Sequence, residues 1–268
     1  MTSSKHWDIV LEKLQDKAHV YAVDLRGFGL SSYHQKINSL KDFSEDLKLF
    51  VERLGLNNFS LIGWSTGGGV AMQFAADYPE LVEKLILVES VGIKGFPILR
   101  KDEQGQPIVG DFLKTQEEIA QDISVAPVLA ALQNRDRAFY RNLWNQGIYT
   151  KHQPSPEKYE EYLEDMLTQR NLVEVMYALV HFNIPKEFNG VEEGSGDVER
   201  IKAPTLVFQG DRDLVIPKRI GEEIAQNLER SELVILEDCG HSPMIDSLEV
   251  FVDKLLEFIG SSERKIPS

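Results

Sequence analysis

The stretch "LIGWSTGGGV" (61–70) constrains the fold more than any other part of the sequence. An apolar run leads into a serine, and three consecutive glycines open a segment with a helical pattern. Glycine loses more backbone freedom on folding than any other residue, so three in a row at a helix start indicate a steric requirement. The stretch therefore predicts a strand, a sharp turn that carries Ser65, and a helix packed closely behind it.

Short apolar runs that are typical of buried strands recur along the chain. They are rich in Val, Leu and Ile and show little polar alternation, as parallel strands covered on both faces do. Segments with apolar residues at helical spacing lie between them. This alternation predicts right-handed βαβ units and an α/β fold with a mostly parallel, doubly wound sheet. The predicted strands are 19–25, 59–64, 84–90, 204–210 and 232–238, and the predicted helices are 39–55, 69–79, 219–229 and 248–260.

Residues 91–199 interrupt this alternation. They contain helical patterns, such as the one over 155–182, but no clear strand. We interpret them as a helical cap inserted between two core strands, above the carboxyl edge of the sheet. The α/β core then comprises residues 1–90 and 200–268, and its tail "SSERKIPS" is expected to fray.

Composition narrows the classes of function. The formal net charge of −14 disfavours nucleic acids and anionic membranes as partners, because phosphate contacts need clustered Lys and Arg. No apolar run is long enough to span a bilayer, and the start of the chain lacks the apolar region of a signal peptide. The single cysteine, Cys239, excludes an intramolecular disulfide, which is typical of a reducing compartment. We therefore expect a cytoplasmic enzyme or binding protein.

The residues "GWSTG" (63–67) match the pattern G-x-S-x-G between a predicted strand and a predicted helix. In this context the pattern predicts a nucleophile elbow, a strained turn that exposes the hydroxyl of Ser65 at the strand end. The glycines two residues before and after Ser65 are expected to avoid collisions with neighbouring backbone. Gly68 and Gly69 are expected to let the helix approach the sheet. A plain turn with a capping serine is the alternative.

A serine hydroxyl is a weak nucleophile and needs a general base, usually histidine. Of the six histidines, only His241 lies just past a late predicted strand, at the sheet edge where such folds bind ligands. The base needs an orienting carboxylate, and Asp211 and Asp213 directly follow another strand. We assign Asp213 to this role and Asp211 to the turn. Glu89, which ends a further strand, is a rival.

Several segments of the chain resemble the α/β-hydrolase family, in particular its small, capped esterases and lactonases. Besides the serine motif, "VYAVDLRGFGLSS" resembles the family's D-x-x-G-x-G-x-S loop and "YPELVEKLILVES" the segment after the nucleophile helix. "GDRDLVIP" resembles its acid loop and "CGHSP" its histidine loop. The resemblance covers nearly the whole chain except the cap. It implies a triad of Ser65, Asp213 and His241, with the Thr66 N–H as an oxyanion donor.

The resemblance also reveals a departure at the start of the chain. The family has early strands and an H-G-containing loop that supplies a second oxyanion donor, whereas this sequence opens at "MTSSKHW", which resembles the end of that loop. We therefore expect a truncated chain that lacks one donor, a loss that typically costs about 10²–10³ in kcat. The missing strands would expose a sheet edge, which favours a homodimer.

The resulting hypothesis is a serine hydrolase that cleaves a small carboxylic ester or lactone through an acyl-enzyme. No cofactor is required, and the sequence has neither metal-ligand spacing nor a dinucleotide-binding glycine loop. Cys239 is interpreted as a small buried loop residue rather than a reactive thiolate. The alternatives are a ligand receptor or signalling protein of the same fold with little turnover, and a truncated, inactive hydrolase.

Apolar and aromatic residues near the elbow and in the cap are candidate substrate contacts. For those in the cap, a place in the cap core is the alternative interpretation. The candidates are Trp64, Phe28, Trp144, Tyr149, His181 and Phe182.

Overall fold

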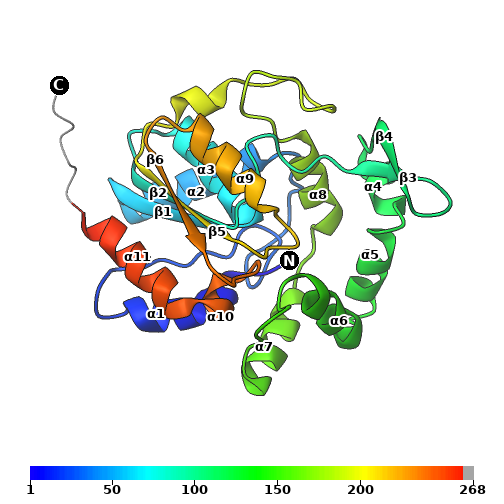
Figure 1. Ribbon diagram of the computed structural model, residues 1–268, viewed down its shortest axis with the longest axis horizontal. Coiled ribbons are helices and arrows are strands. Elements are labelled where there is room, and N and C mark those ends of the chain that lie inside the picture. Colours follow the sequence, from blue (N-terminus) through cyan, green and yellow to red (C-terminus); the bar gives the residue numbers. More distant parts are fainter. Residues whose placement is uncertain (262–268) are drawn as a thin grey trace.

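A sheet of four parallel strands lies at the centre of the computed structural model, which describes residues 1–261 (Figure 1). Its strands, in order across the sheet, are β1 (Phe59–Trp64), β2 (Val82–Val88), β5 (Thr205–Gly210) and β6 (Ser231–Leu236). The central strands β2 and β5 are almost entirely buried, whereas the edge strands are only partly so. Four predicted strands are thus confirmed, with ends shifted by a residue or two. The predicted frayed tail lies outside the described residues, except for Ser261.

The predicted strand over 19–25 is wrong. These residues have no regular secondary structure, and the side chains of Val20 and Tyr21 are 39% and 46% exposed. Apolar, β-branched composition favours a strand, but a strand also needs a hydrogen-bonded neighbour. Within residues 1–261 the sheet ends at β1, so this segment gains no partner.

Helices cover both faces of the sheet (Figure 1). Alternate side chains of β2 point to opposite faces, so Leu85 and Leu87 pack on one cluster and Ile86 and Val88 on the other. The first face carries α2 (Leu40–Leu54), α3 (Thr66–Asp77) and α9 (Lys218–Asn227), and the second carries α1 (Asp8–Leu14) and α11 (Leu248–Gly260). The predicted core helices are therefore confirmed.

Sequence signals define the ends of α2 particularly clearly. Ser39 and Asp42 form a capping box at its start, and Gly55 ends it with a φ of +66°. A left-handed φ is accessible to glycine because it has no Cβ, so the helix stops where the sequence places this residue.

The predicted cap, residues 91–199, contains two strands that the sequence patterns do not indicate. β3 (Leu99–Lys101) and β4 (Pro107–Phe112) form an antiparallel hairpin, so the expectation of no strand here is wrong. Asp102 stabilises the turn between them by accepting hydrogen bonds from the backbone N–H groups of Gln104 and Gln106. Gly105, with a φ of +79°, lies in the same turn.

The other elements of this region are helices, which lie to one side of the sheet in Figure 1. The pattern over 155–182 forms two helices rather than one, interrupted near the buried Asn171, whose side chain donates to the Arg26 carbonyl. The boundaries of the cap at residues 91 and 199 stay a prediction. The helices are α4 (Gln116–Gln121), α5 (Ala126–Gln133), α6 (Arg137–Gly147), α7 (Pro156–Met166) and α8 (Leu172–His181).

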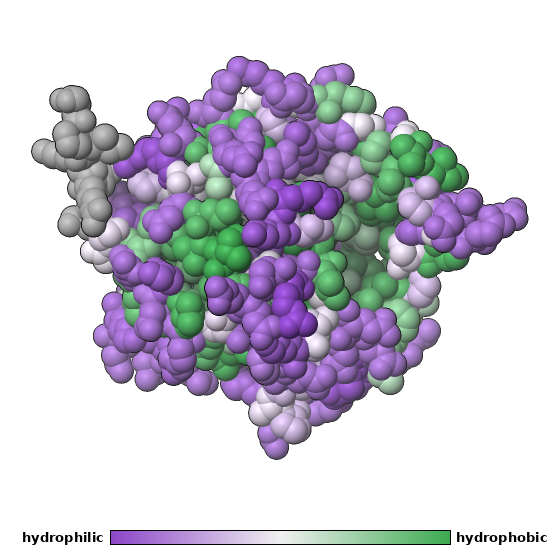
Figure 2. All heavy atoms as spheres, in the orientation of Figure 1, coloured by the Kyte–Doolittle hydropathy of each residue, from purple (hydrophilic) through white to green (hydrophobic). Residues whose placement is uncertain are grey.

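Three short elements complete the described chain: η1 (Ser4–Trp7), η2 (Asp197–Arg200) and α10 (Pro243–Asp246). Figure 2 shows that polar residues cover much of one face, while apolar side chains gather near β4 and α4 and again on the left of the view, near β6. Val109 of β4 is 92% exposed.

No helix among residues 1–261 has both the length and the apolar character needed to cross a bilayer.

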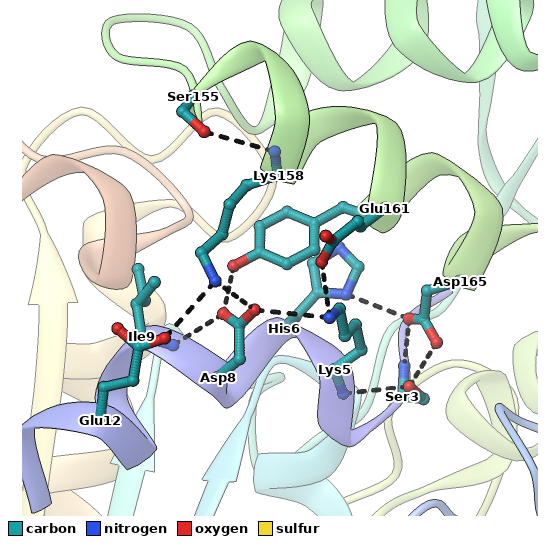
Figure 3. A network of polar contacts seen from close by, with 11 residues as sticks. Ser3, Lys5, His6, Asp8, Ile9, Glu12, Ser155, Lys158, Glu161 and Asp165 are labelled. Carbon is teal, nitrogen blue, oxygen red and sulfur yellow. Dashed lines mark hydrogen bonds and ion pairs between the residues drawn. The ribbon is translucent and has the colours of Figure 1, made fainter.

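A polar network fastens α7 to the N-terminal segment (Figure 3). Asp8 accepts hydrogen bonds from Lys158 Nζ at 2.8 Å and from the Tyr162 hydroxyl at 2.5 Å. Asp165 accepts from the Ser3 backbone N–H at 2.9 Å and from His6 Nδ1 at 3.1 Å. The network therefore joins the predicted cap to η1 and α1.

Candidate active site

Ser65 occupies the turn between β1 and α3. Its φ of +54° and ψ of −120° fall where residues with a side chain are rarely found, and such strain concentrates at functional sites. The turn is held by hydrogen bonds from Ser65 N to Val88 O (2.9 Å) and from Gly68 N and Val91 N to Ser65 O (2.9 and 3.2 Å). We call this strained turn the elbow, and its role as the site of a nucleophile stays a prediction.

The glycines around Ser65 differ in what an added Cβ would contact. A Cβ on Gly63 would overlap the Gly67 carbonyl, and one on Gly68 would overlap the Ser90 side chain. A Cβ on Gly69 would lie 2.7 Å from two side chains of the surrounding core. A Cβ on Gly67, by contrast, would meet only open space, so the expectation that this glycine avoids a collision is wrong.

His241 and Asp213 form a buried hydrogen-bonded pair. His241 Nδ1 lies 2.8 Å from Asp213 Oδ2, and the two residues are 2% and 7% exposed. Burial alone would raise the pKa of Asp213, but hydrogen bonds from His241 and from the Ile216 N–H hold it below its usual range. Because a carboxylate only accepts, Nδ1 carries the hydrogen, which leaves Nε2 as the basic nitrogen of a neutral imidazole.

Trp64 links this pair to the elbow. Its Nε1–H donates to the His241 carbonyl at 2.7 Å, and the rings of the two residues lie 5.7 Å apart. Trp64 directly precedes Ser65, so this hydrogen bond fastens the histidine loop to the serine turn. Thr66 is the first residue of α3, where backbone N–H groups have no partner within the helix. The fold thus brings Ser65, Asp213 and His241 to one edge of the sheet.

Two further carboxylates hold the histidine loop. Asp211 Oδ1 accepts from Cys239 N at 3.1 Å, and Asp246 Oδ2 accepts from Gly240 N at 2.8 Å. Asp211 therefore does more than form the turn to which we assigned it. Asp246 was not among the predicted residues, and its one signal in the sequence is its position shortly after His241.

Cys239 lies in the same loop but does not have the surroundings of a nucleophile. Its side chain is fully buried, and burial together with the nearby carboxyl groups, Glu89 first, raises the pKa of its thiol. A thiol rather than a thiolate is therefore present at neutral pH, and the thiolate is the reactive form.

Glu89, the rival acid, is fully buried and faces the loop that carries Asp213. Its Oε1 accepts from Gly210 N at 2.7 Å and its Oε2 from Gln209 Nε2 at 2.8 Å. Burial and the negative charge of Asp213 raise its pKa well above the usual range. Asp213, which makes the hydrogen bond to His241, is therefore better placed than Glu89 to orient the imidazole.

The six candidate substrate contacts do not lie together in one part of the protein. Trp64, Trp144 and Tyr149 lie in one cluster, with ring centroids 6.4 Å apart for the first two and 5.2 Å for the last two. Phe28 and Phe182 belong to the cluster on the other face of the sheet.

His181 makes polar contacts with the segments around it. Its ring nitrogens interact with Glu192 at 2.7 Å and with the Lys114 carbonyl at 2.9 Å. Of the six candidates, Trp64, Trp144 and Tyr149 are the ones that ring contacts connect to His241 within the described residues. The role of all six candidates as substrate contacts stays a prediction.

A second buried His–Asp pair, absent from the sequence expectations, lies nearby. The ring of His6 stacks on Tyr162 at 4.3 Å and lies 6.3 Å from the ring of Trp64. Burial lowers the pKa of His6 by more than Asp165 raises it. The hydroxyl of Ser3 donates to Asp165 rather than to the imidazole, and His6 Nε2 has no hydrogen-bond partner within residues 1–261.

The part of the chain that the structure describes holds no group of three or more His, Cys, Asp or Glu side chains arranged for a metal ion.

A family model described as the alpha/beta hydrolase fold matches residues 1–248. The chain belongs to this family. It is 29% identical, over 90% of its length and 76% of the relative's, to a 2-hydroxy-6-oxononadienedioate/2-hydroxy-6-oxononatrienedioate hydrolase of Paraburkholderia phymatum. It is 26% identical, over 92% of its length and 87% of the relative's, to a pimeloyl-[acyl-carrier protein] methyl ester esterase of Nitrosomonas europaea.

Solved structures agree with the fold of this α/β hydrolase. An esterase from Exiguobacterium antarcticum superposes with a TM-score of 0.72 at 19% identity, covering 97% of this chain and 88% of the esterase. At this identity the similarity supports the architecture, and the chemistry depends on the residues at the elbow.

Proposed function

We propose that this α/β hydrolase is a serine hydrolase that cleaves a carboxylic ester or lactone through an acyl-enzyme. One observation carries the proposal: the strained Ser65 directly follows Trp64, whose indole N–H binds the loop of the Asp213-paired His241. A serine held in this conformation beside a histidine–aspartate pair has the parts needed for nucleophilic catalysis.

In the proposed reaction, Ser65 Oγ attacks the substrate carbonyl and His241 Nε2 takes its proton. Asp213 keeps the imidazole oriented and stabilises the imidazolium that forms. The Thr66 N–H and the start of α3 stabilise the oxyanion. His241 then protonates the leaving alcohol oxygen, which in a lactone stays attached to the acyl group. Finally, His241 activates the water that releases Ser65 from the acyl group.

The names of the relatives suggest two substrate classes. The methyl ester esterase of Nitrosomonas europaea supports an ester. The Paraburkholderia hydrolase, whose identity to this chain is slightly higher, favours a second candidate, a 2-hydroxy-6-oxo diacid. Both candidates require nucleophilic attack on a carbonyl carbon, so the elbow and the His241–Asp213 pair serve either.

Steady-state turnover tests the proposal. The wild-type chain and Ser65→Ala are assayed with methyl esters of dicarboxylic acids, lactones of several ring sizes and a 2-hydroxy-6-oxo dienedioate. We expect many turnovers per wild-type molecule on one class and none with Ser65→Ala. Release of no more than one product per molecule would overturn the proposal in favour of a receptor, and equal activity of Ser65→Ala would overturn the role of Ser65.

A further inference from the structure

A second carboxyl group, that of Glu89, lies behind Asp213 and has no part in the reaction described above. Glu89 directly follows β2, is fully buried and has a φ of +42°. A glutamate in this left-handed region is strained, and such conformations persist where the surroundings enforce them. Here the Glu89 N–H donates to the Phe208 carbonyl at 3.0 Å, which fixes the backbone of Glu89 to β5.

The carboxyl group of Glu89 holds the base of the acid loop. It accepts from Gly210 N at 2.7 Å and from Gln209 Nε2 at 2.8 Å. The same Gln209 nitrogen donates to the Ile216 carbonyl at 3.0 Å, and Ile216 N donates to Asp213 Oδ1 at 2.9 Å. Glu89 is therefore connected through two residues to the carboxylate that orients His241.

The groups that face Glu89 carry mainly negative charge. They are Asp213 on the acid loop, Asp246 on α10 and the Cys239 thiol, with His241 beyond Asp213. Burial first, and then the charges of Asp213 and Asp246, raise the pKa of Glu89. Two neighbouring buried carboxyl groups cannot both ionise easily, and here Asp213 has the imidazole and two backbone N–H groups to stabilise its charge.

We propose that Glu89 is a positioning residue: as a neutral acid it donates a hydrogen bond to Asp213 and keeps Asp213 as the sole anion facing His241. This inference rests on the proposed function, because it concerns the acid of the same triad. In this arrangement a hydrogen bond donated by the neutral acid of Glu89 stabilises the ionised form of Asp213. Ionisation of Glu89 would instead place a second negative charge against Asp213 and push the acid loop away from His241.

Two substitutions distinguish the effect of the Glu89 carboxyl proton from the effect of its side-chain volume. Glu89→Gln keeps the length of the side chain and a donor but cannot ionise, whereas Glu89→Leu keeps a comparable bulk and removes both donor and acceptors. We expect Glu89→Gln to retain most of kcat. We expect Glu89→Leu to lose kcat by about 10²-fold, the scale of a small misplacement of catalytic groups, with KM little changed. The wild-type kcat of a folded Glu89→Leu would overturn the proposal.

Infrared spectroscopy detects the protonation state of the Glu89 carboxyl group and does not depend on turnover. At pH 7 the wild-type chain is expected to show the carbonyl stretch of a buried neutral carboxylic acid. This band should be absent in Glu89→Gln and shifted in Asp213→Asn, which changes its hydrogen-bond acceptor. An unchanged spectrum in Glu89→Gln would overturn the proposal. Because the infrared result needs no activity, a wild-type chain with the band but no turnover would identify a failure of the proposed function rather than of the protonation of Glu89.

Discussion

The two buried histidine–aspartate pairs of this α/β hydrolase invite comparison. His241 lies 2.8 Å from Asp213 and His6 lies 3.1 Å from Asp165, through Nδ1 in both cases. The histidines are 2% and 3% exposed. The pKa of each aspartate would be raised by burial but is held below its usual range by hydrogen bonds, from the histidine first. By distance, burial and charge alone, the pairs are nearly the same.

Their surroundings differ. The His241 pair lies at the carboxyl edge of the sheet, fastened through Trp64 to a strained serine. The His6 pair lies where η1 meets α7, and its serine, Ser3, donates to the aspartate instead of the imidazole. A histidine–aspartate hydrogen bond is therefore no sign of catalysis by itself. What distinguishes the His241 pair is the strained serine turn that the Trp64 hydrogen bond joins to its loop.

The largest expected contrast is between the two histidines. His241→Gln should lower kcat by a factor on the order of 10⁶, the scale of removing the histidine of a serine triad. His6→Gln should leave kcat within about tenfold, because a structural substitution acts mainly on folding. Steady-state kinetics on the best ester measures both, and a His6→Gln variant as inactive as His241→Gln would break the comparison.

The second-largest expected contrast is between the kcat values of variants at the two aspartates. Asp213→Asn is expected to lower kcat by about 10⁴, because the amide favours the wrong imidazole tautomer. Asp165→Asn should mainly lower the melting temperature, since it weakens contacts between α7 and the N-terminal segment. Equal kcat values for the two folded variants would contradict the distinction.

Of the two pairs, the His241 pair is the one linked to the strained turn at Ser65. The glycines of this turn allow a further comparison. Gly68→Ala should lower the free energy of unfolding by about 1–3 kcal/mol, because the new methyl group overlaps Ser90. Gly67→Ala is the matched control one residue away: it meets open space and should raise that free energy by roughly 0.5–1 kcal/mol. Urea unfolding distinguishes the two, and an equal loss in both would contradict the packing described.

The smallest expected effect is a pH dependence of the His6 pair. Burial lowers the pKa of His6 from the usual 6.5, so the folded state binds fewer protons than the unfolded state. The stability that neutral His6 provides is present above pH 6.5 and declines as the pH falls below it. Urea unfolding from pH 7.5 to 5 should therefore show a steeper loss for wild type than for His6→Gln. A parallel decline would contradict the burial of a neutral His6.

Much of this arrangement follows from local sequence. Apolar runs predict β1, β2, β5 and β6, and the rule that such sheets bind ligands at their carboxyl edge points to Ser65, Asp213 and His241. Ser65 directly follows β1, and Asp213 and His241 lie in the loops that follow β5 and β6, so the order of the chain places all three at this edge.

What the sequence does not reveal depends on contacts between distant residues. His6 and Asp165 are 159 positions apart, and Glu89 is 121 positions from Gly210, so no local pattern links them. The failed strand over 19–25 has the right composition but no neighbour in the described sheet. The hairpin of β3 and β4 depends on turn contacts of Asp102 that a helical interpretation of the cap overlooked.

Reaction with a fluorophosphonate, with the modified residue located by peptide mass spectrometry, tests whether Ser65 is a nucleophile that His241 activates. We expect an adduct on Ser65 that is retained in His6→Gln and lost in His241→Gln. An adduct on Ser3, an adduct on Ser65 that forms equally well in His241→Gln, or no adduct on folded protein would contradict this expectation.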